Sequence, residues 1–403
     1  MRKQGYREKP DPDREMADEM YSLPDGEHGG SMAPDRIRLD FSVNTNPCGM
    51  PEGVRKILAD AAGLGGYYPD ITCRRLREKI LDHERSHYQG TKSLRLSQIV
   101  AGNGASELIM ALAHAYSTVD PKAAYQRAAY QKTAYPKTAV MLQTPLFSGY
   151  ERAFSASGTR LLFLEHDSDF SVAPDTPERI VREQPDLVVL CQPGNPAGSM
   201  IGEHLLEKIV EACGMTGCLL IVDECFIAFT KNAEARSASR FLESGCNLVI
   251  LRAFTKLYAM PGLRLGYAVC ADEKTAQRLR KHLPEWNVSS VAQAAGCAAL
   301  EDEDYVSVTT RKIRQERARL SSRLEEMGFK TVRGEADYIL LRSDMELYEE
   351  LLKRGILIRR CSNYRRMPRT GYYRIAVRLP EEDDILLSVL EEIAERAESK
   401  TEE

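Results

Sequence analysis

The segment Asn247–Val269, NLVILRAFTKLYAMPGLRLGYAV, decides the fold class of this chain and carries its most informative cations. It opens with a run of apolar, strand-favouring side chains, which predicts a buried strand. Thr255 and Lys256 follow that strand at once, and Arg264 lies eight residues further on, beside a Pro-Gly pair. A lysine in this place is either a solvated side chain or a functional amine whose pKa is lowered by its surroundings. Taken alone, the segment favours the solvated side chain.

Apolar runs of the same kind recur before this segment and alternate with amphipathic, helix-like stretches. That order predicts an α/β fold, with a large domain over residues 35–271 built on a mostly parallel sheet. From about Asp272 the pattern changes to long charged helices and then to short strands, which predicts a smaller α+β C-terminal domain over 272–403. Residues 1–34 are polar and lack periodicity, so we expect a flexible arm. The part of the chain next to this arm is expected to contribute to the small domain.

A tyrosine-rich stretch near residues 121–139 interrupts the large domain. The sequence KAAYQRAAYQKTAYPKTAVM repeats an AYQ or AYP unit with a five-residue step. This step matches no solenoid repeat, and loops absorb insertions at low cost. We interpret the stretch as an exposed insertion before a core strand.

The composition limits the classes of protein to which the chain can belong. Its 403 residues are 43% hydrophobic and 28% charged, which is typical of globular domains and excludes a core-poor, disordered chain. The net charge of -4 gives no reason to expect a nucleic-acid or membrane partner. The ten cysteines contain no CxxC pair, and no stretch has the length and apolarity of a signal peptide or membrane span. We therefore expect a cytoplasmic protein with reduced thiols and a small-molecule substrate.

A glycine-rich turn, GNGAS at residues 102–106, joins a predicted strand to a predicted helix. Glycines let the backbone approach a ligand closely, and the free N–H groups at a helix start suit a phosphate. The spacing matches neither the Rossmann nor the Walker pattern, and many helices begin with Gly and Ser as plain caps. The turn alone is therefore only weak evidence for a phosphate site.

Two further strands end in polar side chains. Asn195 follows LVVLC within a Pro/Gly-rich turn, where its amide either binds a ligand oxygen or bonds its own backbone. Asp223 ends the strand of CLLIVDECFIAF, where a carboxylate needs a partner such as a protonated ring nitrogen or a structural arginine. Together with the GNGAS turn, Lys256 and Arg264, these residues recur at the carboxyl ends of successive strands. They supply the groups needed to hold pyridoxal phosphate.

At this level of detail the chain resembles a known family. The matching segments are HGG, LDFSVNTNPCGMP, YYPD, AGNGASE, TPLFSGYERA, PGNPAG, DECFIAF, LRAFTKLYAMPGLRLGY, ILIRRCSNY and YYRIAVR. They resemble the fold type I pyridoxal-phosphate enzymes, in the class I/II aminotransferase branch shared by histidinol-phosphate aminotransferases and threonine-phosphate decarboxylases. The match looks closest to the decarboxylases and covers nearly all of the chain after the arm.

The resemblance implies a role for individual residues around the cofactor. Lys256 is the implied catalytic lysine, which bonds covalently to the cofactor. The other implied cofactor-binding residues are Gly104, Ala105, Ser106, Thr255 and Arg264 at the phosphate, Asn195 at the ring hydroxyl, Asp223 at the ring nitrogen, and Phe147 stacked on the ring. Tyr68 is implied to reach the same phosphate from the other subunit of a homodimer.

The resemblance also implies a substrate site. Arg374 matches the position that grips the substrate carboxylate, and Arg359 lies in the same pocket. His28, from the HGG segment, and Asn44 are the other implied substrate-binding residues.

Three positions depart from the family pattern. The usual NNPTG turn is GNPAG here, so Asn195 is kept while two neighbouring side chains are lost. Phe226 stands where histidinol-phosphate aminotransferases have a tyrosine, and this feature resembles the decarboxylases. Ala253 replaces a serine or threonine, which removes one donor to the phosphate.

The activity implied by the resemblance is decarboxylation of L-threonine O-3-phosphate to (R)-1-aminopropan-2-yl phosphate, in cobalamin biosynthesis. The alternative is a class I/II aminotransferase such as histidinol-phosphate aminotransferase. A third interpretation, a non-catalytic regulator domain, is disfavoured because Lys256 is present and no DNA-binding segment is evident.

Overall fold

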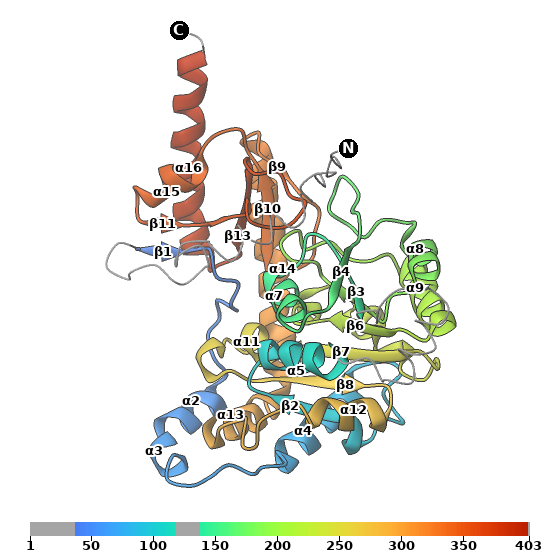
Figure 1. Ribbon diagram of the computed structural model, residues 1–403. Helices are drawn as coiled ribbons and strands as arrows, with labels where there is room; N and C mark the ends of the chain where they lie inside the picture. Colours follow the sequence, from blue (N-terminus) through green and yellow to red (C-terminus); the bar gives the residue numbers. More distant parts are fainter. Residues whose placement is uncertain (1–36, 118–137, 402–403) are drawn as a thin grey trace, which may run out of the picture.

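The computed structural model describes residues 37–117 and 138–401, and its largest feature is a seven-stranded sheet (Figure 1). In spatial order the strands are β2 (Ile99–Gly102), β8 (Gly266–Cys270), β7 (Asn247–Ala253), β6 (Leu219–Asp223), β5 (Leu187–Cys191), β3 (Ala139–Leu142) and β4 (Arg160–Phe163). Strand β8 runs antiparallel to β2 and β7, and the other neighbouring strands are parallel. The predicted α/β fold with a mostly parallel sheet is therefore confirmed.

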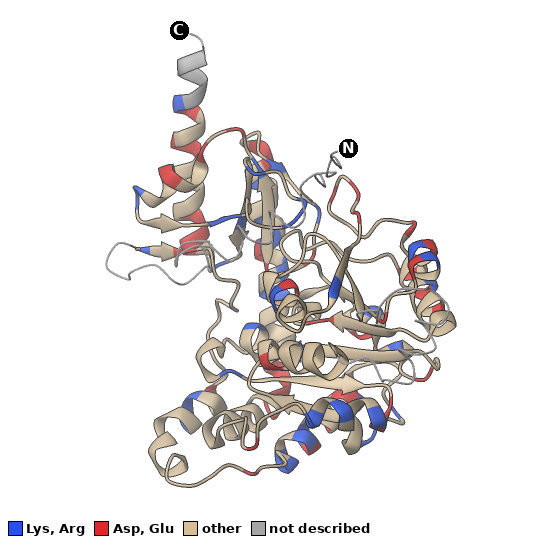
Figure 2. Cartoon of the chain, viewed as in Figure 1, with Lys and Arg blue, Asp and Glu red and all other residues tan. Residues whose placement is uncertain are grey.

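Helices cover both faces of this sheet. One face packs against α5 (Ala105–Ser117), α7 (Ser148–Ala156) and α12 (Glu273–Arg280), and the other against α4 (Arg74–His87), α8 (Thr176–Glu183), α9 (Glu203–Thr216) and α13 (Ser290–Leu300). Successive residues of a strand point to opposite faces, so Leu187 and Val188 belong to different core clusters. Because both faces are covered, the strands read as continuous apolar runs, while charged residues gather on the outer helices (Figure 2).

A smaller body lies beside the sheet. Its antiparallel strands, in spatial order, are β12 (Arg359–Arg360), β13 (Tyr372–Ala376), β10 (Tyr338–Arg342) and β9 (Lys330–Thr331), and its helices are α14 (Glu303–Glu326), α15 (Leu347–Leu352) and α16 (Pro380–Thr401). Strand β1 (Leu39–Asp40) pairs in parallel with β11 (Ile356–Leu357). This pairing brings the start of the described chain into the small body. Short helices α2 (Glu52–Ala59), α3 (Ala61–Leu64), α10 (Ala233–Arg236) and α11 (Phe254–Leu257) complete the fold.

Helices α12 and α13 follow the predicted boundary at residue 272 and pack against the large sheet. Ala276 and Leu279 of α12 pack in the same core cluster as α5, and Ala292 of α13 packs with α4. Beyond residue 272, the first residues in the core of the small body come from the long helix α14, such as Leu320. Helices on the outside of a sheet are charged on their solvent face, so charge density alone does not show which body a helix packs against.

Three predictions lie partly or wholly outside the described residues: the arm at 1–34, its His28, and the tyrosine-rich insertion, apart from its last two residues. Within the described ranges, no helix has both the length and the apolarity needed to cross a membrane. All ten cysteines fall in those ranges and are free thiols; eight are buried, Cys225 is partly buried and Cys48 is exposed.

Candidate active site

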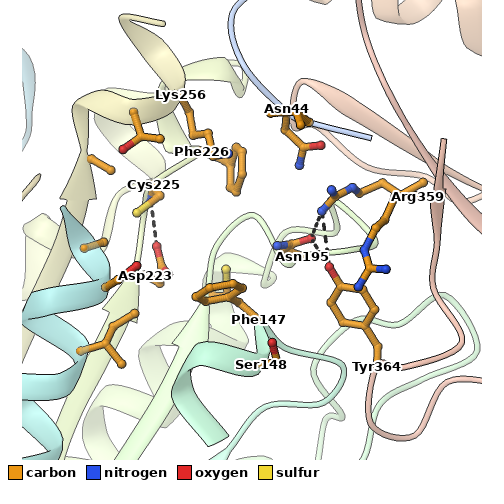
Figure 3. Close-up of a pocket in the computed structure, with 18 of the residues that line it drawn as sticks. Asn44, Phe147, Ser148, Asn195, Asp223, Cys225, Phe226, Lys256, Arg359 and Tyr364 are labelled. Atoms are coloured by element: carbon orange, nitrogen blue, oxygen red, sulfur yellow. Dashed lines mark hydrogen bonds between the residues drawn. The ribbon is translucent and has the colours of Figure 1, made fainter. Parts of the chain in front are cut away.

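A cavity of about 440 Å³ opens where the carboxyl ends of the sheet strands meet the small body. Figure 3 shows Lys256, Phe226, Asp223 and Phe147 on one side of this cavity, and Asn195, Arg359 and Tyr364 on the other. The structure brings most of the predicted site residues into its wall: Asn44, Ala105, Ser106, Phe147, Asn195, Asp223, Thr255, Lys256, Arg264, Arg359 and Arg374. Residues 44 to 264 of this set come from the large domain or its entry, and the last two from the small body.

Strand register explains why these residues meet. Asp223 pairs with Cys191 on β5 and with Leu251 on β7, so β5 and β6 end at the same level and β7 continues to Ala253. Lys256 lies on α11, the short helix that follows β7 directly. The carboxyl ends of parallel strands form the ligand-binding edge of an open α/β sheet.

The phosphate-binding end of the cavity depends on two glycines. Gly104 has φ +79°, and a Cβ there would lie 2.7 Å from Nη2 of Arg264. A Cβ on Gly266 would lie 2.8 Å from the backbone nitrogen of Ala105. These glycines therefore let the Arg264 guanidinium and the first N–H groups of α5 approach the same space. Gly104 shapes this cradle without lining the cavity itself.

Asp223 is a buried carboxylate with donors but no cation. Its Oδ2 accepts a hydrogen bond from the Tyr150 hydroxyl at 2.8 Å, and its Oδ1 accepts from the backbone N–H of Cys225 at 3.0 Å. Burial and the neighbouring Asp223 charge raise the pKa of Tyr150 well above its ordinary value, so Tyr150 stays a hydrogen donor. No ion pair of Asp223 occurs within the described part of the chain, which leaves its charge available to a cationic ring nitrogen in the cavity.

Asn195 is oriented by residues from the small body. Its Oδ1 accepts hydrogen bonds from Nη1 of Arg374 at 2.6 Å and from the Tyr364 hydroxyl at 3.3 Å. With the oxygen held by these two donors, the amide Nδ2 is the atom left to donate to a ligand oxygen.

Arg359 and Arg374 form the cationic side of the cavity. They face each other in register on β12 and β13, and both are buried. Arg359 donates to Oδ1 of Asn363 at 2.7 Å, and Arg374 also donates to the Ser42 carbonyl at 2.8 Å. Neither arginine has a carboxylate at ion-pair distance among residues 37–117 and 138–401. Two buried guanidinium groups without counter-anions are expected to bind an anionic ligand.

Lys256 lies on the large-domain side of the cavity, next to Phe226 (Figure 3). Its Nζ is 5.9 Å from the centre of the Phe226 ring, and its carbonyl accepts the N–H of Asn46 at 3.1 Å. Desolvation lowers the pKa of the Lys256 ammonium, against the opposing charge of Asp337. A lowered pKa favours the neutral amine, which is the form that covalent attachment to an aldehyde requires.

Some contributors to the site were missed or lie elsewhere. Sequence reasoning did not single out Tyr364, Asn363 or Asp337, which enter from the small body through tertiary packing. Tyr68 does not line the cavity of its own chain: its side chain is 83% exposed, and its ring lies 5.0 Å from that of Trp286. Its predicted contact across a subunit boundary remains a prediction.

The residues present fit pyridoxal phosphate. The cradle of α5 and Arg264 suits its phosphate, the unpaired Asp223 carboxylate its ring nitrogen, the Asn195 amide its ring hydroxyl, and the Lys256 amine its aldehyde carbon. Among the described residues, Asp223 and Lys256 form no ion pair, and neither the Asn195 Nδ2 nor the Lys256 Nζ donates a hydrogen bond. The fold and the pocket together define a pyridoxal-phosphate enzyme of fold type I.

Comparisons with known proteins agree with this class. The family model for aminotransferase class I and II matches residues 36–390. The chain is 32% identical over 380 residues to threonine-phosphate decarboxylase of Salmonella typhimurium, covering 91% of this chain and 96% of that protein. It is 30% identical over 365 residues to histidinol-phosphate aminotransferase of Methanosarcina mazei, covering 89% of each. The structure of histidinol-phosphate aminotransferase from Sinorhizobium meliloti in complex with pyridoxal-5'-phosphate superposes with a TM-score of 0.74 at 21% identity, covering 90% of this chain and 92% of that one.

The chain therefore belongs to the aminotransferase class I and II family. Pyridoxal phosphate is its cofactor, as the sequence predicted.

Proposed function

We propose that this protein decarboxylates L-threonine O-3-phosphate to (R)-1-aminopropan-2-yl phosphate, a reaction of cobalamin biosynthesis. The similarity to the Salmonella typhimurium decarboxylase supports this reaction, because it extends over 96% of that protein. The absence of a tyrosine hydroxyl at Phe226, a feature that resembles the decarboxylases, supports it as well.

The observation that carries the proposal is the pair Arg359 and Arg374. Directly paired residues on antiparallel strands have Cα atoms about 4.5–5.5 Å apart, so the two guanidinium groups start from neighbouring positions. Threonine phosphate carries a carboxylate on Cα and a phosphate on the adjacent Cβ, so two anionic groups lie close together. Histidinol phosphate carries one anionic group and an imidazole. Two adjacent cations without counter-anions match two adjacent anionic groups better.

The residues of this chain have defined tasks in such a reaction. Pyridoxal phosphate, when bound, supplies an electron sink next to the substrate Cα. Arg374 and Arg359 hold the two anions and so fix which bond at Cα is exposed to cleavage. Asn195 and Asp223 orient the ring-binding end of the pocket, and Phe226 keeps an apolar surface beside Lys256. The Lys256 amine then delivers the proton that replaces the departing carboxylate at Cα.

The alternative is an aminotransferase that acts on histidinol phosphate or a similar amine. The similarity to the Methanosarcina mazei aminotransferase, at 30% identity, supports it nearly as well. An aminotransferase would use the same cofactor residues but would need a keto acid to accept the amino group.

One comparison separates the two activities. The purified, cofactor-loaded protein is incubated with threonine O-3-phosphate alone, or with histidinol phosphate and 2-oxoglutarate. We expect carbon dioxide and aminopropanol phosphate from the first mixture and no glutamate from the second. Glutamate from the second mixture with no carbon dioxide from the first would replace the decarboxylase by the aminotransferase.

We also propose that the protein acts as a homodimer in which Tyr68 completes the partner's phosphate site. The support is an exposed aromatic and aliphatic patch made of Tyr67, Tyr68, Ile71 and Trp286, which is unusual on a free surface. The test mixes Tyr68→Ala with Lys256→Ala. Exchange of subunits should restore up to about a quarter of the activity in trans, whereas additive, unrestored activities and a monomeric mass would contradict the dimer.

A further inference from the structure

Asp337 is a buried carboxylate that the tasks described above do not use. It comes directly before β10, its side chain is 1% exposed, and its backbone carbonyl accepts the N–H of Val377 at 2.9 Å. Neither carboxylate oxygen has a hydrogen-bond partner in another described residue. Leaving a carboxylate buried without donors is costly, so its place needs an explanation.

The surroundings of Asp337 point to the active site. Its charge acts on two cations of the cavity wall, Lys256 and Arg374, and neither lies at direct ion-pair distance. Other unpartnered buried atoms occur in the same wall or next to it: Oδ1 of Asn44, Oγ1 of Thr45 and Nε of Arg374. The chain at Asn44 to Asn46 runs beside Lys256, because the Asn46 N–H bonds to the Lys256 carbonyl. Asp337 therefore belongs to an open polar cluster behind the reactive lysine.

We propose that Asp337 is a positioning residue that favours the protonated form of the Lys256 amine against desolvation, and so favours proton delivery to the substrate Cα over proton removal from it. This inference rests on the proposed function. It explains how a residue of this chain would favour decarboxylation over transamination, although both reactions use the same cofactor residues.

The proton balance gives the reason. Decarboxylation breaks the bond between Cα and the carboxylate carbon and makes a Cα–H bond, so the site has to supply one proton. Transamination starts with loss of the Cα proton, so the site has to accept one. A protonated Lys256 is competent for the first step, and a neutral Lys256 for the second.

The groups around Lys256 act on its pKa in both directions. Desolvation is the largest effect and lowers the pKa, as do Arg374 and Arg264, whereas Asp337 and Cys225 raise it. Burial raises the pKa of Asp337 to about 6, and Lys256 and Arg374 lower it from what burial alone would give. Asp337 is thus an anion above about pH 6, and in that range it raises the pKa of Lys256.

The variant Asp337→Asn tests this role, because it removes the charge and keeps the size of the side chain. Two titrations are compared with the wild type: the pH dependence of acetylation of Lys256 in the cofactor-free chain, read by peptide mass spectrometry, and the pH dependence of the visible absorbance of the cofactor-loaded protein. We expect both midpoints to fall by about one pH unit. Unchanged midpoints would overturn the proposal.

Asp272→Asn is the matched control. Asp272 caps α12 just after β8, which begins near the cavity at Gly266 and ends at Cys270 on the opposite edge of the sheet. Asparagine also caps helices, so this variant makes the same chemical change away from Lys256 and should leave both midpoints unchanged. Should Asp337→Asn not fold, Asp337→Ser carries the same test.

The ratio of products tests the consequence. With threonine O-3-phosphate as the substrate, we measure the carbon dioxide released and the pyridoxamine phosphate formed per substrate consumed. The ratio of carbon dioxide to pyridoxamine phosphate is then compared between the variants. Because one pH unit changes the protonated fraction about tenfold, the ratio should fall up to about tenfold in Asp337→Asn. A shifted midpoint with an unchanged ratio would overturn the link to the reaction. A shifted midpoint in a protein that releases no carbon dioxide would uphold the charge effect and refute the decarboxylase.

Discussion

Arg252 and Lys256 lie four residues apart at the end of β7, and the comparison of their surroundings separates structure from function. Nη2 of Arg252 lies 3.0 Å from Glu224, its Nε lies 3.5 Å from Glu84, and its guanidinium lies 3.4 Å from the centre of the Tyr88 ring. Burial alone would lower the pKa of Arg252, but Glu84, Tyr88 and Glu224 together raise it. Lys256 has no ion pair within the described chain, and desolvation lowers its pKa.

The difference between these surroundings indicates which buried charges are available to bind a ligand. The Arg252 cluster is closed, since its cation has two carboxylates at ion-pair distance. The cluster of Lys256, Asp337 and Arg374 is open, since its charges act on one another without direct pairing and its two cations line a cavity. A closed cluster contributes to folding, whereas an open one keeps its charges for substrate and cofactor.

The largest expected effect comes from the open cluster. Lys256→Ala should lower turnover by about 10⁴-fold or more, because it removes the covalent attachment and the proton donor together. Its thermal midpoint should equal or exceed that of the wild type, since no paired charge is lost. Lys79→Ala, which breaks a surface pair with Glu301, is the control for losing a lysine. Borohydride reduction of the wild type should place the cofactor on Lys256, and a label elsewhere would contradict the assignment.

The closed cluster should give the opposite result. Arg252→Met leaves Glu84 and Glu224 buried without their cation, and we expect it to cost about 3–5 kcal/mol of unfolding free energy in urea titrations. Arg240→Met removes an arginine that pairs with the exposed Glu203 and Glu207, and should cost about 1 kcal/mol or less. Equal losses in the two variants would mean that the Arg252 cluster is not a structural unit.

A third variant tests whether Arg374 belongs to the open cluster. Arg374→Ala removes the donor to Asn195 and the anchor for an anion, and should lower kcat/KM about a hundredfold, because small misplacements of a reacting bond are costly. Arg342→Ala, on the same small sheet but exposed, is the control. The free energy of unfolding should change little. A lower free energy of unfolding with an unchanged kcat/KM would mean that Arg374 has a structural role like that of Arg252.

The parts of this comparison that could be predicted from sequence are local. An apolar run followed by Thr255 and Lys256, and a glycine turn before a helix, indicate strand ends and a phosphate cradle within a few residues. Arg359 and Arg374 were found only through the family resemblance. Asp337 and Tyr364 were missed, because their roles arise when the small body packs against the large sheet. The charged outer face of α12 does not reveal from sequence which body the helix packs against, so its packing on the large sheet is visible only in the structure.

The smallest expected effect concerns Asp383 and Glu316, two neighbouring carboxyl groups in the small body. Asp383, in the first turn of α16, accepts the Arg378 N–H at 3.2 Å, and its pKa is raised to about 8 by burial and then by the neighbouring Glu316. A carboxyl group has a pKa near 4 in the unfolded chain, so its contribution to stability is complete below about pH 4 and is lost as the pH rises through 8.

Asp383→Asn tests this, because the variant keeps the acceptor for Arg378 but cannot ionise. Between pH 5 and 9 the wild type should therefore lose at least about 1.4 kcal/mol relative to the variant, which corresponds to one pKa unit, in urea titrations. Parallel pH profiles for the two proteins would show that Asp383 has its ordinary pKa in the folded chain, and that this cluster is closed like that of Arg252.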